Sequence, residues 1–261
     1  MTWGVLYGIG LGPGDPELLT LKALRLLSRL PVIFYPAYGD SPGGYALSIL
    51  QQAFAQSDLD WGRQQPGQGG QVTMGQGPSL MARCRPLATP MARGAEVERP
   101  HWDAAAQVVG QVLQRGQNAA FITEGDPLLY STFIHLCEAL AAQFPAAPVE
   151  VIPGVSSVTA AAARARFPLA RADDRVAVIP ATYDPDQLGH VLATFDTVVL
   201  MKVSRVLDRL IDILAAQGLV QNAVLVERCG TPEERIVREL VSLRGQRVHY
   251  FSLILVRNQQ A

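Results

Sequence analysis

Three short stretches of the chain combine glycine with proline, aspartate or serine directly after an apolar run. They cover residues 8–15, 125–127 and 153–157. A strand that ends in small residues and passes into a helix start leaves backbone N–H groups without partners, and such groups can bind a small polar ligand. The three stretches therefore predict ligand-binding loops at the carboxyl ends of strands in an α/β protein.

The first of these loops differs from the G-x-G-x-x-G fingerprint of dinucleotide-binding proteins. Pro13 stands where the third glycine belongs, and proline has no N–H to donate to a pyrophosphate. About 20 residues further on, an acidic residue would bind the ribose, but residues 33–36 read Ile-Phe-Tyr-Pro. The loop is therefore expected to accept a ligand other than NAD.

The sequence offers little for metal or thiol chemistry. It contains no H-E-x-x-H zinc motif, and its three cysteines, Cys84, Cys137 and Cys229, are widely spaced without a C-x-x-C pair. This pattern favours free thiols in a reducing cytoplasm over a zinc site or disulfides, so no metal is expected. The four histidines are widely separated in the sequence, and His101 is the candidate for accepting a proton in a reaction.

Composition excludes several classes of protein. Apolar residues make up 49% of the chain and charged residues 17%, and the formal net charge is −1. No overall field therefore attracts nucleic acid or an anionic membrane. No apolar run approaches the roughly 18 residues of a membrane-spanning helix. We expect a soluble cytoplasmic protein with neither a nucleic acid nor a membrane as partner.

Hydrophobic periodicity predicts alternating strands and helices. Strands are expected at residues 5–9, 32–35, 119–123, 149–152, 176–179, 197–201, 223–226 and about 251–256. Helices are expected at residues 16–30, 46–55, 102–115, 128–142 and 206–217, with another capped by Ser156 or Ser157 and others between the strands of the second half. The alternation indicates a parallel sheet in the first half of the chain and a mixed sheet in the second.

Two smaller α/β domains fit this pattern better than one large sheet. We expect them at residues 1–155 and 156–261. Glycine and glutamine fill 11 of the 16 positions from 62 to 77, with no helical or strand period. A flexible insertion is therefore expected at about 56–82.

Five stretches of the chain resemble the tetrapyrrole methylases, the methyltransferases of the cobalamin and sirohaem pathways. They are residues 8–20, 121–127, 151–157, 198–203 and 226–231. Further details resemble the branch that methylates C20 of precorrin-2 or cobalt-precorrin-2: Tyr35-Pro36, Glu124 with residues 129–132, Met201-Lys202, and residues 250–253. The resemblance implies the two-domain α/β fold of the class III methyltransferases, S-adenosylmethionine in a cleft between the domains, and a homodimer.

The resemblance also implies which residues bind the cofactor. They are Pro13, Glu124, Gly125, Asp126, Leu129, Ser131, Thr132, Ser156, Ser157, Met201 and Gly230. A helix cap is the alternative role for the two serines at 156 and 157, and it is the expected role of Asp15. For Asp126 we favour a cofactor contact, so that Asp126→Ala would weaken cofactor binding with little unfolding.

Precorrin-like substrates carry many carboxylates, so cationic side chains are expected in the substrate site. The candidates are Arg83, Arg85, Arg93 and Lys202, and a solvated loop is the alternative for the arginines. Methyl transfer from a sulfonium requires donor and acceptor to be held in line with water excluded. Three alternatives stay open: another tetrapyrrole position, an RNA or diphthine methylase of the same superfamily, and an S-adenosylmethionine-binding module without catalysis.

Overall fold

The computed structural model describes residues 2–37, 44–56, 79–89, 95–182 and 185–258. These residues form two compact units, Met1–Val155 and Ser156–Ala261, and each unit is described by itself. Most of the insertion expected at about 56–82 lies outside the described residues. Its last residues are described, and they begin the short helix α3 (Leu80–Arg83), so helical structure starts earlier than expected.

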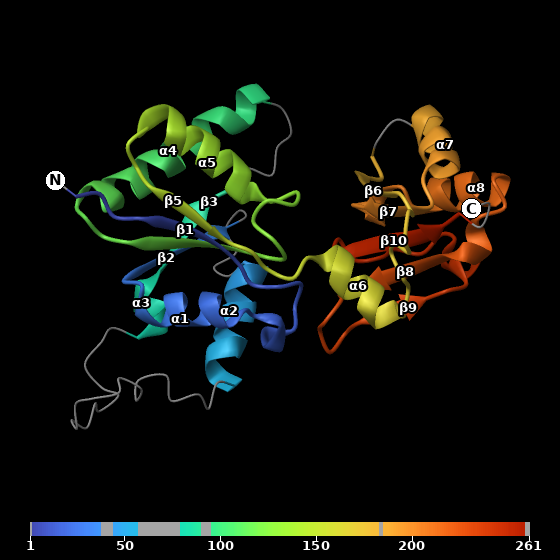
Figure 1. Ribbon diagram of the computed structural model, residues 1–261, viewed down its shortest axis with the longest axis horizontal. Coiled ribbons are helices and arrows are strands. Elements are labelled where there is room, and N and C mark those ends of the chain that lie inside the picture. The colour runs from blue at the N-terminus through green and yellow to red at the C-terminus, as the bar shows by residue number, and fades with distance from the viewer. Residues whose placement is uncertain (1, 38–43, 57–78, 90–94, 183–184, 259–261) are drawn as a thin grey trace. The chain divides into compact units, whose positions relative to one another are not determined.

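The first unit contains a five-stranded sheet in which every neighbouring pair of strands is parallel. Its order is β3-β2-β4-β1-β5. The strands are β1 (Leu6–Gly10), β2 (Val32–Ala37), β3 (Cys84–Ala88), β4 (Ala119–Thr123) and β5 (Val149–Ile152). Figure 1 shows helices on both faces of this sheet. They are α4 (Ala95–Gln114) and α5 (Thr132–Gln143) on one face, and α1 (Leu21–Arg29), α2 (Tyr45–Gln56) and α3 on the other.

Alternate residues of the strands fill two separate cores. In β2, Phe34 packs with the core under α4 and α5, whereas its neighbours Ile33 and Tyr35 pack with the core under α1 and α2. In β4, Phe121 and Ile122 divide between the same two cores. Successive side chains of a strand point to opposite faces, so a sheet covered on both faces needs continuous apolar runs. The predicted strands have this composition.

Helix starts in the first unit follow local capping. Asp15 caps only a short 3-10 helix, Pro16–Leu18, and Thr20 then caps α1, with the Ala23 N–H donating to its hydroxyl at 3.2 Å. The expected cap at Asp15 is confirmed, but the single helix expected from Pro16 is wrong, because the chain forms a short 3-10 helix and then a separate α-helix. Similarly, α5 begins at Thr132 rather than at residue 128, because Tyr130 has φ of 53° and Ser131 is the cap.

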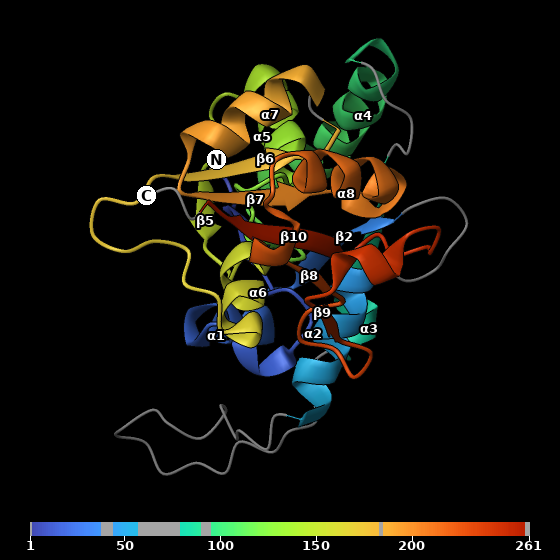
Figure 2. The same cartoon turned by 90° about the vertical axis from the view of Figure 1, so that its right-hand side faces the viewer.

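The second unit contains a mixed five-stranded sheet of order β6-β7-β10-β8-β9. Only the β6–β7 pair is parallel. The strands are β6 (Val176–Pro180), β7 (Thr197–Met201), β8 (Ala223–Glu227), β9 (Arg235–Val237) and β10 (Ser252–Arg257). Helices α7 (Pro185–Thr194) and α8 (Leu207–Ala216) pack on one face, and α6 (Ser157–Ala165) lies against β8 and β10 on the other (Figure 2). The expected fold, parallel then mixed, is confirmed.

Gly8 determines how closely α5 approaches β1. A Cβ atom at this position would lie 2.1 Å from the nearest ring carbon of Phe133, a fully buried residue of α5. That separation is far below a van der Waals contact, so any side chain on Gly8 would force the helix and the strand apart.

We therefore predict that Gly8→Ala lowers the free energy of unfolding by about 1–3 kcal/mol, the usual cost of overpacking a core. Urea unfolding measures this loss. Phe133→Leu removes the ring that clashes, so the double variant should lose less than the sum of the two single variants. Strictly additive losses would contradict this account of the contact.

Candidate functional site

The loops that follow β4, β1 and β5 meet at one edge of the first sheet. Because β1 lies between β4 and β5 and all three run parallel, their carboxyl ends are neighbours. The first two loops join directly through an isolated bridge between Gly12 and Gly125. The Gly125 N–H donates to the Gly12 carbonyl at 2.8 Å, and the Leu11 N–H donates to the Thr123 carbonyl at 2.9 Å. In an open α/β sheet, this edge is where ligands bind.

Three glycines allow these strand ends to touch. A Cβ atom on Gly10 would lie 2.4 Å from the Gly125 carbonyl oxygen, and one on Gly154 would lie 2.2 Å from the same oxygen. Gly125 itself has φ of 63°, which disfavours other residues. The glycines are therefore required by backbone packing, whatever they contact besides.

Asp126 connects two of the loops. Its Oδ1 accepts the Leu128 N–H at 2.9 Å, and its Oδ2 accepts the Gly154 N–H at 3.0 Å. Each carboxylate oxygen thus has a backbone donor, one in its own turn and one in the loop after β5. The sequence favoured a cofactor contact over a cap, but this geometry adds a structural role, so Asp126→Ala is no longer expected to leave stability intact.

Glu124 and Pro13 are both linked to the first turn of α2. Glu124 Oε1 accepts the N–H of Ala46 at 3.2 Å, and the Tyr45 hydroxyl donates to the Pro13 carbonyl at 3.2 Å. Burial raises the pKa of the Glu124 carboxyl, against the opposing effect of its backbone hydrogen bonds. The helix N-terminus favours a negative charge at this carboxylate.

The segment after β4 turns sharply before α5. The Leu129 N–H donates to the Asp126 carbonyl at 3.4 Å, and Tyr130 is left-handed. Ser131 caps α5 by accepting the Phe133 N–H at 3.2 Å, and Thr132 is the first residue of that helix. The expected contacts of this segment thus lie together at a helix start.

In the second unit, the proposed residues lie at helix and strand ends. Ser156 is the cap of α6 and accepts the Thr159 N–H at 3.2 Å, and Ser157 is the first residue of that helix. Met201 ends β7, and its carbonyl accepts the Ala181 N–H at 2.6 Å. Ser156 therefore has the helix-capping role that the sequence offered as the alternative to a cofactor contact.

The ends of β7 and β8 carry unusual backbone conformations. Leu253 in β10 pairs with Met201 at the end of β7 and also faces the last residues of β8. The residues just beyond these ends, Lys202 and Arg228, have φ of 59° and 49°, and Gly230 has φ of 80°. A left-handed residue other than glycine costs of order 1–3 kcal/mol, and such residues cluster at functional sites. This observation supports a binding role for the two strand ends.

The cationic residues expected to bind substrate occupy different surroundings. The Arg83 guanidinium donates from Nη1 to the carbonyls of Leu27 at 2.9 Å and Leu30 at 2.8 Å, and so closes the end of α1. Arg83 therefore has a structural role, and its expected contact with the substrate stays a prediction. Arg85 is exposed on β3, Arg93 lies outside the described residues, and Lys202 is half-buried.

Sequence reasoning missed three polar residues near the ends of β8 and β10. Glu227 is buried, accepts the His249 N–H at Oε1 and accepts Arg235 Nε at 2.7 Å. Burial and the nearby Arg228 lower the pKa of His249. Glu234 accepts the Gly230 N–H at 2.8 Å in the turn between β8 and β9. The strand-ending Glu227-Arg228 pair is the signal that the sequence offered.

The described residues contain no cluster of three histidine, cysteine or carboxylate side chains able to hold a metal ion. They also contain no helix long and apolar enough to cross a membrane. His101 is exposed on α4. Nothing described places its ring against a group that would lose a proton.

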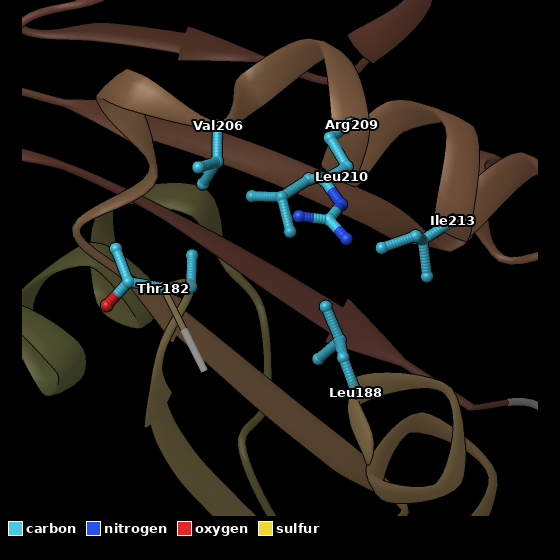
Figure 3. A pocket seen from close by; sticks show the side chains of 7 residues that line it. Thr182, Leu188, Val206, Arg209, Leu210 and Ile213 are labelled. Carbon is cyan, nitrogen blue, oxygen red and sulfur yellow. The ribbon is translucent and has the colours of Figure 1, made fainter. Parts of the chain in front are cut away.

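A small cavity of about 150 Å³ lies between α7 and α8 in the second unit (Figure 3). Leu188, Leu210 and Ile213 line it, with Arg209 reaching over it from α8. None of the predicted site residues belongs to this cavity, so it is not assigned to the site.

The comparisons with known proteins show which family the chain belongs to. Residues 5–243 match the family model of the Tetrapyrrole (Corrin/Porphyrin) Methylases. The chain belongs to this family, and the resemblance seen in the sequence is confirmed. Its fold is also that of solved members: a uroporphyrin-III C-methyltransferase from Thermus thermophilus complexed with S-adenosylhomocysteine matches with a TM-score of 0.62 at 23% identity, over 97% of this chain and 92% of that one.

Two relatives are named as C(20)-methyltransferases of precorrin-2 or cobalt-precorrin-2. A precorrin-2 C(20)-methyltransferase of Sinorhizobium sp is 35% identical over 97% of this chain and 95% of its own length. A cobalt-precorrin-2 C(20)-methyltransferase of Salmonella typhimurium is 33% identical over 98% of this chain and 97% of its own. The likeness extends over both units.

We predict that Asp126→Ala lowers the free energy of unfolding by about 1–3 kcal/mol, because two backbone N–H groups lose their acceptor. Asp126→Asn keeps one acceptor oxygen and should lose less. Asp15→Ala is the control, because Asp15 accepts the Glu17 N–H in its own turn and, among the residues that the structure describes, bonds to no second loop. Chemical denaturation compares the three variants, and an Asp126→Ala protein as stable as the wild type would refute the bridging role.

A second prediction concerns pH. Because burial raises the pKa of Glu124, the folded state binds this proton more tightly than the unfolded state does. Stability from this group is present at low pH and lost as pH rises through the folded pKa. Glu124→Gln keeps an oxygen for the Ala46 N–H but does not titrate.

The stability of Glu124→Gln relative to wild type should therefore increase from about pH 4 to about pH 7. Urea unfolding across this range measures the difference. Parallel profiles for the two proteins would show that Glu124 has no raised pKa.

Proposed function

We propose that this chain transfers the methyl group of S-adenosylmethionine to C20 of precorrin-2 or cobalt-precorrin-2, in cobalamin biosynthesis. Membership of the tetrapyrrole methylase family and two C(20)-methyltransferase relatives at 35% and 33% identity support this activity. The observation that carries it is the joining of three glycine loops at one edge of the first sheet, held by Asp126.

The residues of this edge fit the cofactor. Carbonyl and hydroxyl groups, with backbone N–H groups at two helix starts, suit a ligand that carries an ammonium, a carboxylate and a nucleoside. The solved uroporphyrin-III relative with S-adenosylhomocysteine has the same fold. Bound S-adenosylmethionine supplies a methyl group that is already activated on a sulfonium.

Each loop has a proposed task in holding this cofactor. Pro13 lines the pocket, and Glu124 with Gly125, Asp126 and Leu129 contacts the methionine end. Hydroxyl and backbone contacts come from Ser131, Thr132, Ser156 and Ser157. Met201 and Gly230 flank the adenosine. Ser131 and Ser156 already cap helices, so they would contact the cofactor through remaining lone pairs or as donors.

The chain's contribution to the reaction is orientation. Donor sulfur, methyl carbon and acceptor carbon must lie in line at short range with water excluded, and such positioning can supply roughly 7–11 kcal/mol of the barrier. The glycine contacts fix the loops without side chains between them, so they preorganise this arrangement. Arg83, Arg85, Arg93 and Lys202 are the proposed partners of substrate carboxylates. Of these, Arg83 also donates from Nη1 to the end of α1.

We further propose that the protein is a cytoplasmic homodimer that uses neither nucleic acid nor a membrane. Support comes from the family resemblance and from the net charge of −1. The three cysteines are free thiols in the structure, as a reducing compartment would keep them. Light scattering coupled to size-exclusion chromatography tests the oligomeric state, and a monomer would overturn this part.

The test of the activity uses S-adenosylmethionine labelled with carbon-13 in its methyl group, with precorrin-2 and cobalt-precorrin-2 assayed side by side. We expect the label at C20 in NMR spectra of the product, and the faster substrate identifies the natural one. Label at another ring carbon would assign the chain to another branch. Binding of S-adenosylhomocysteine without turnover on either substrate would indicate a module that lacks catalysis.

A further inference from the structure

The turn between β8 and β9 is held at both ends by glutamates. Glu227, the last residue of β8, bonds Arg235 at the start of β9, and the two residues also pair in the β8–β9 ladder. Within the turn, Arg228 and Gly230 are both left-handed. The β8–β9 ladder and the bond to Arg235 hold Glu227 in place. The middle of the turn, around Gly230, lies beyond the ladder and needs a separate contact to hold it.

Glu234 supplies that support. Its Oε2 accepts the Gly230 N–H at 2.8 Å, and its two oxygens lie 2.8 and 2.9 Å from Nε of Arg164 on α6. The Glu234 side chain is only 11% exposed, whereas Arg164 is 60% exposed. A mostly buried carboxylate with a charged partner and a backbone donor is costly to leave unpaired.

These contacts link two segments that are far apart in the sequence. Arg164 lies in the last turn of α6, and Ser156 and Ser157 begin the same helix. A nine-residue helix is a rigid connection, so Glu234 relates the position of Gly230 to that of the two serines. The single N–H of Gly230 is also fully used by Glu234, so Gly230 has only its carbonyl and its Cα surface left for a ligand.

We propose that Glu234, with Arg164, is a positioning residue that sets the conformation of the Gly230 turn and thereby the affinity for the adenosine part of the cofactor. This inference rests on the proposed function, since Gly230 is a proposed adenosine contact. Glu234 itself need not touch the cofactor.

The test is the affinity of the intact protein for S-adenosylhomocysteine, measured by calorimetry. Glu234→Gln keeps the shape of the side chain but removes its charge, and we expect roughly tenfold weaker binding. The KM for S-adenosylmethionine should rise similarly, with kcat and the KM for the tetrapyrrole little changed. Arg164→Met should weaken binding as well, and Arg164→Lys should recover part of the loss.

Asp174→Asn is the matched control. The Asp174 side chain is 17% exposed, and Oδ2 accepts the Arg171 N–H at 2.8 Å and Nη2 of Arg257 at 2.5 Å. Asp174, like Glu234, accepts one backbone N–H and bonds one arginine, and it lies in the same unit. It is not one of the proposed cofactor contacts. We expect a comparable fall in thermal stability and unchanged affinity.

Three results would overturn the proposal. Wild-type affinity in both folded Glu234→Gln and Arg164→Met would show that the turn needs no such support. If Asp174→Asn weakens the binding of S-adenosylhomocysteine as much as Glu234→Gln does, the loss of affinity follows from lower stability and not from the position of the turn. If the wild-type protein itself does not bind S-adenosylhomocysteine, the proposed function fails first, and the positioning role fails with it.

Discussion

Gly10, Gly125 and Gly154 lie so close that a single added methyl group would push their strand ends apart. This backbone contact is the constraint on which the site depends. It allows the loops after β1, β4 and β5 to join through the Gly12–Gly125 bridge, and Asp126 then bonds the loop after β5. Because no side chain lies between these glycines, backbone groups form the surface on which we propose that the ligand binds. Catalysis by orientation requires this kind of fixed, preorganised surface.

The second unit also has turns of fixed conformation at its strand ends, but different contacts hold them. Its sheet is mixed, so the ends of β7 and β8 lie on either side of β10 and are not adjacent. Lys202 and Arg228 turn the chain there in left-handed conformations that are intrinsically unfavourable. Buried carboxylates compensate, since Glu227 and Glu234 tie the β8 turn to β9 and α6. The strained turn after β8 is therefore held by charge pairs, where the first unit uses glycine packing.

The sequence predicted well wherever apolar periodicity was strong. Strands such as β4 and β7 have the expected bounds, because strands buried on both faces need continuous apolar runs. It missed β3 and β9, which are short edge strands with exposed charged residues, and it gave no bounds for α7. It identified the glycine loops but not the contacts of Asp126 and Glu234, because those partners lie 28 and 70 residues away along the chain. Such pairings depend on tertiary structure alone.

The central claim is that the three glycine loops of the first unit bind the methyl donor. Hydrogen–deuterium exchange with and without S-adenosylhomocysteine tests it most directly, because exposed loop amides exchange fast and bound ones are protected. The account predicts that protection appears in peptides covering residues 11–15, 124–131 and 153–157. Ligand binding that leaves all three peptides unchanged, with protection confined to other segments, would contradict it.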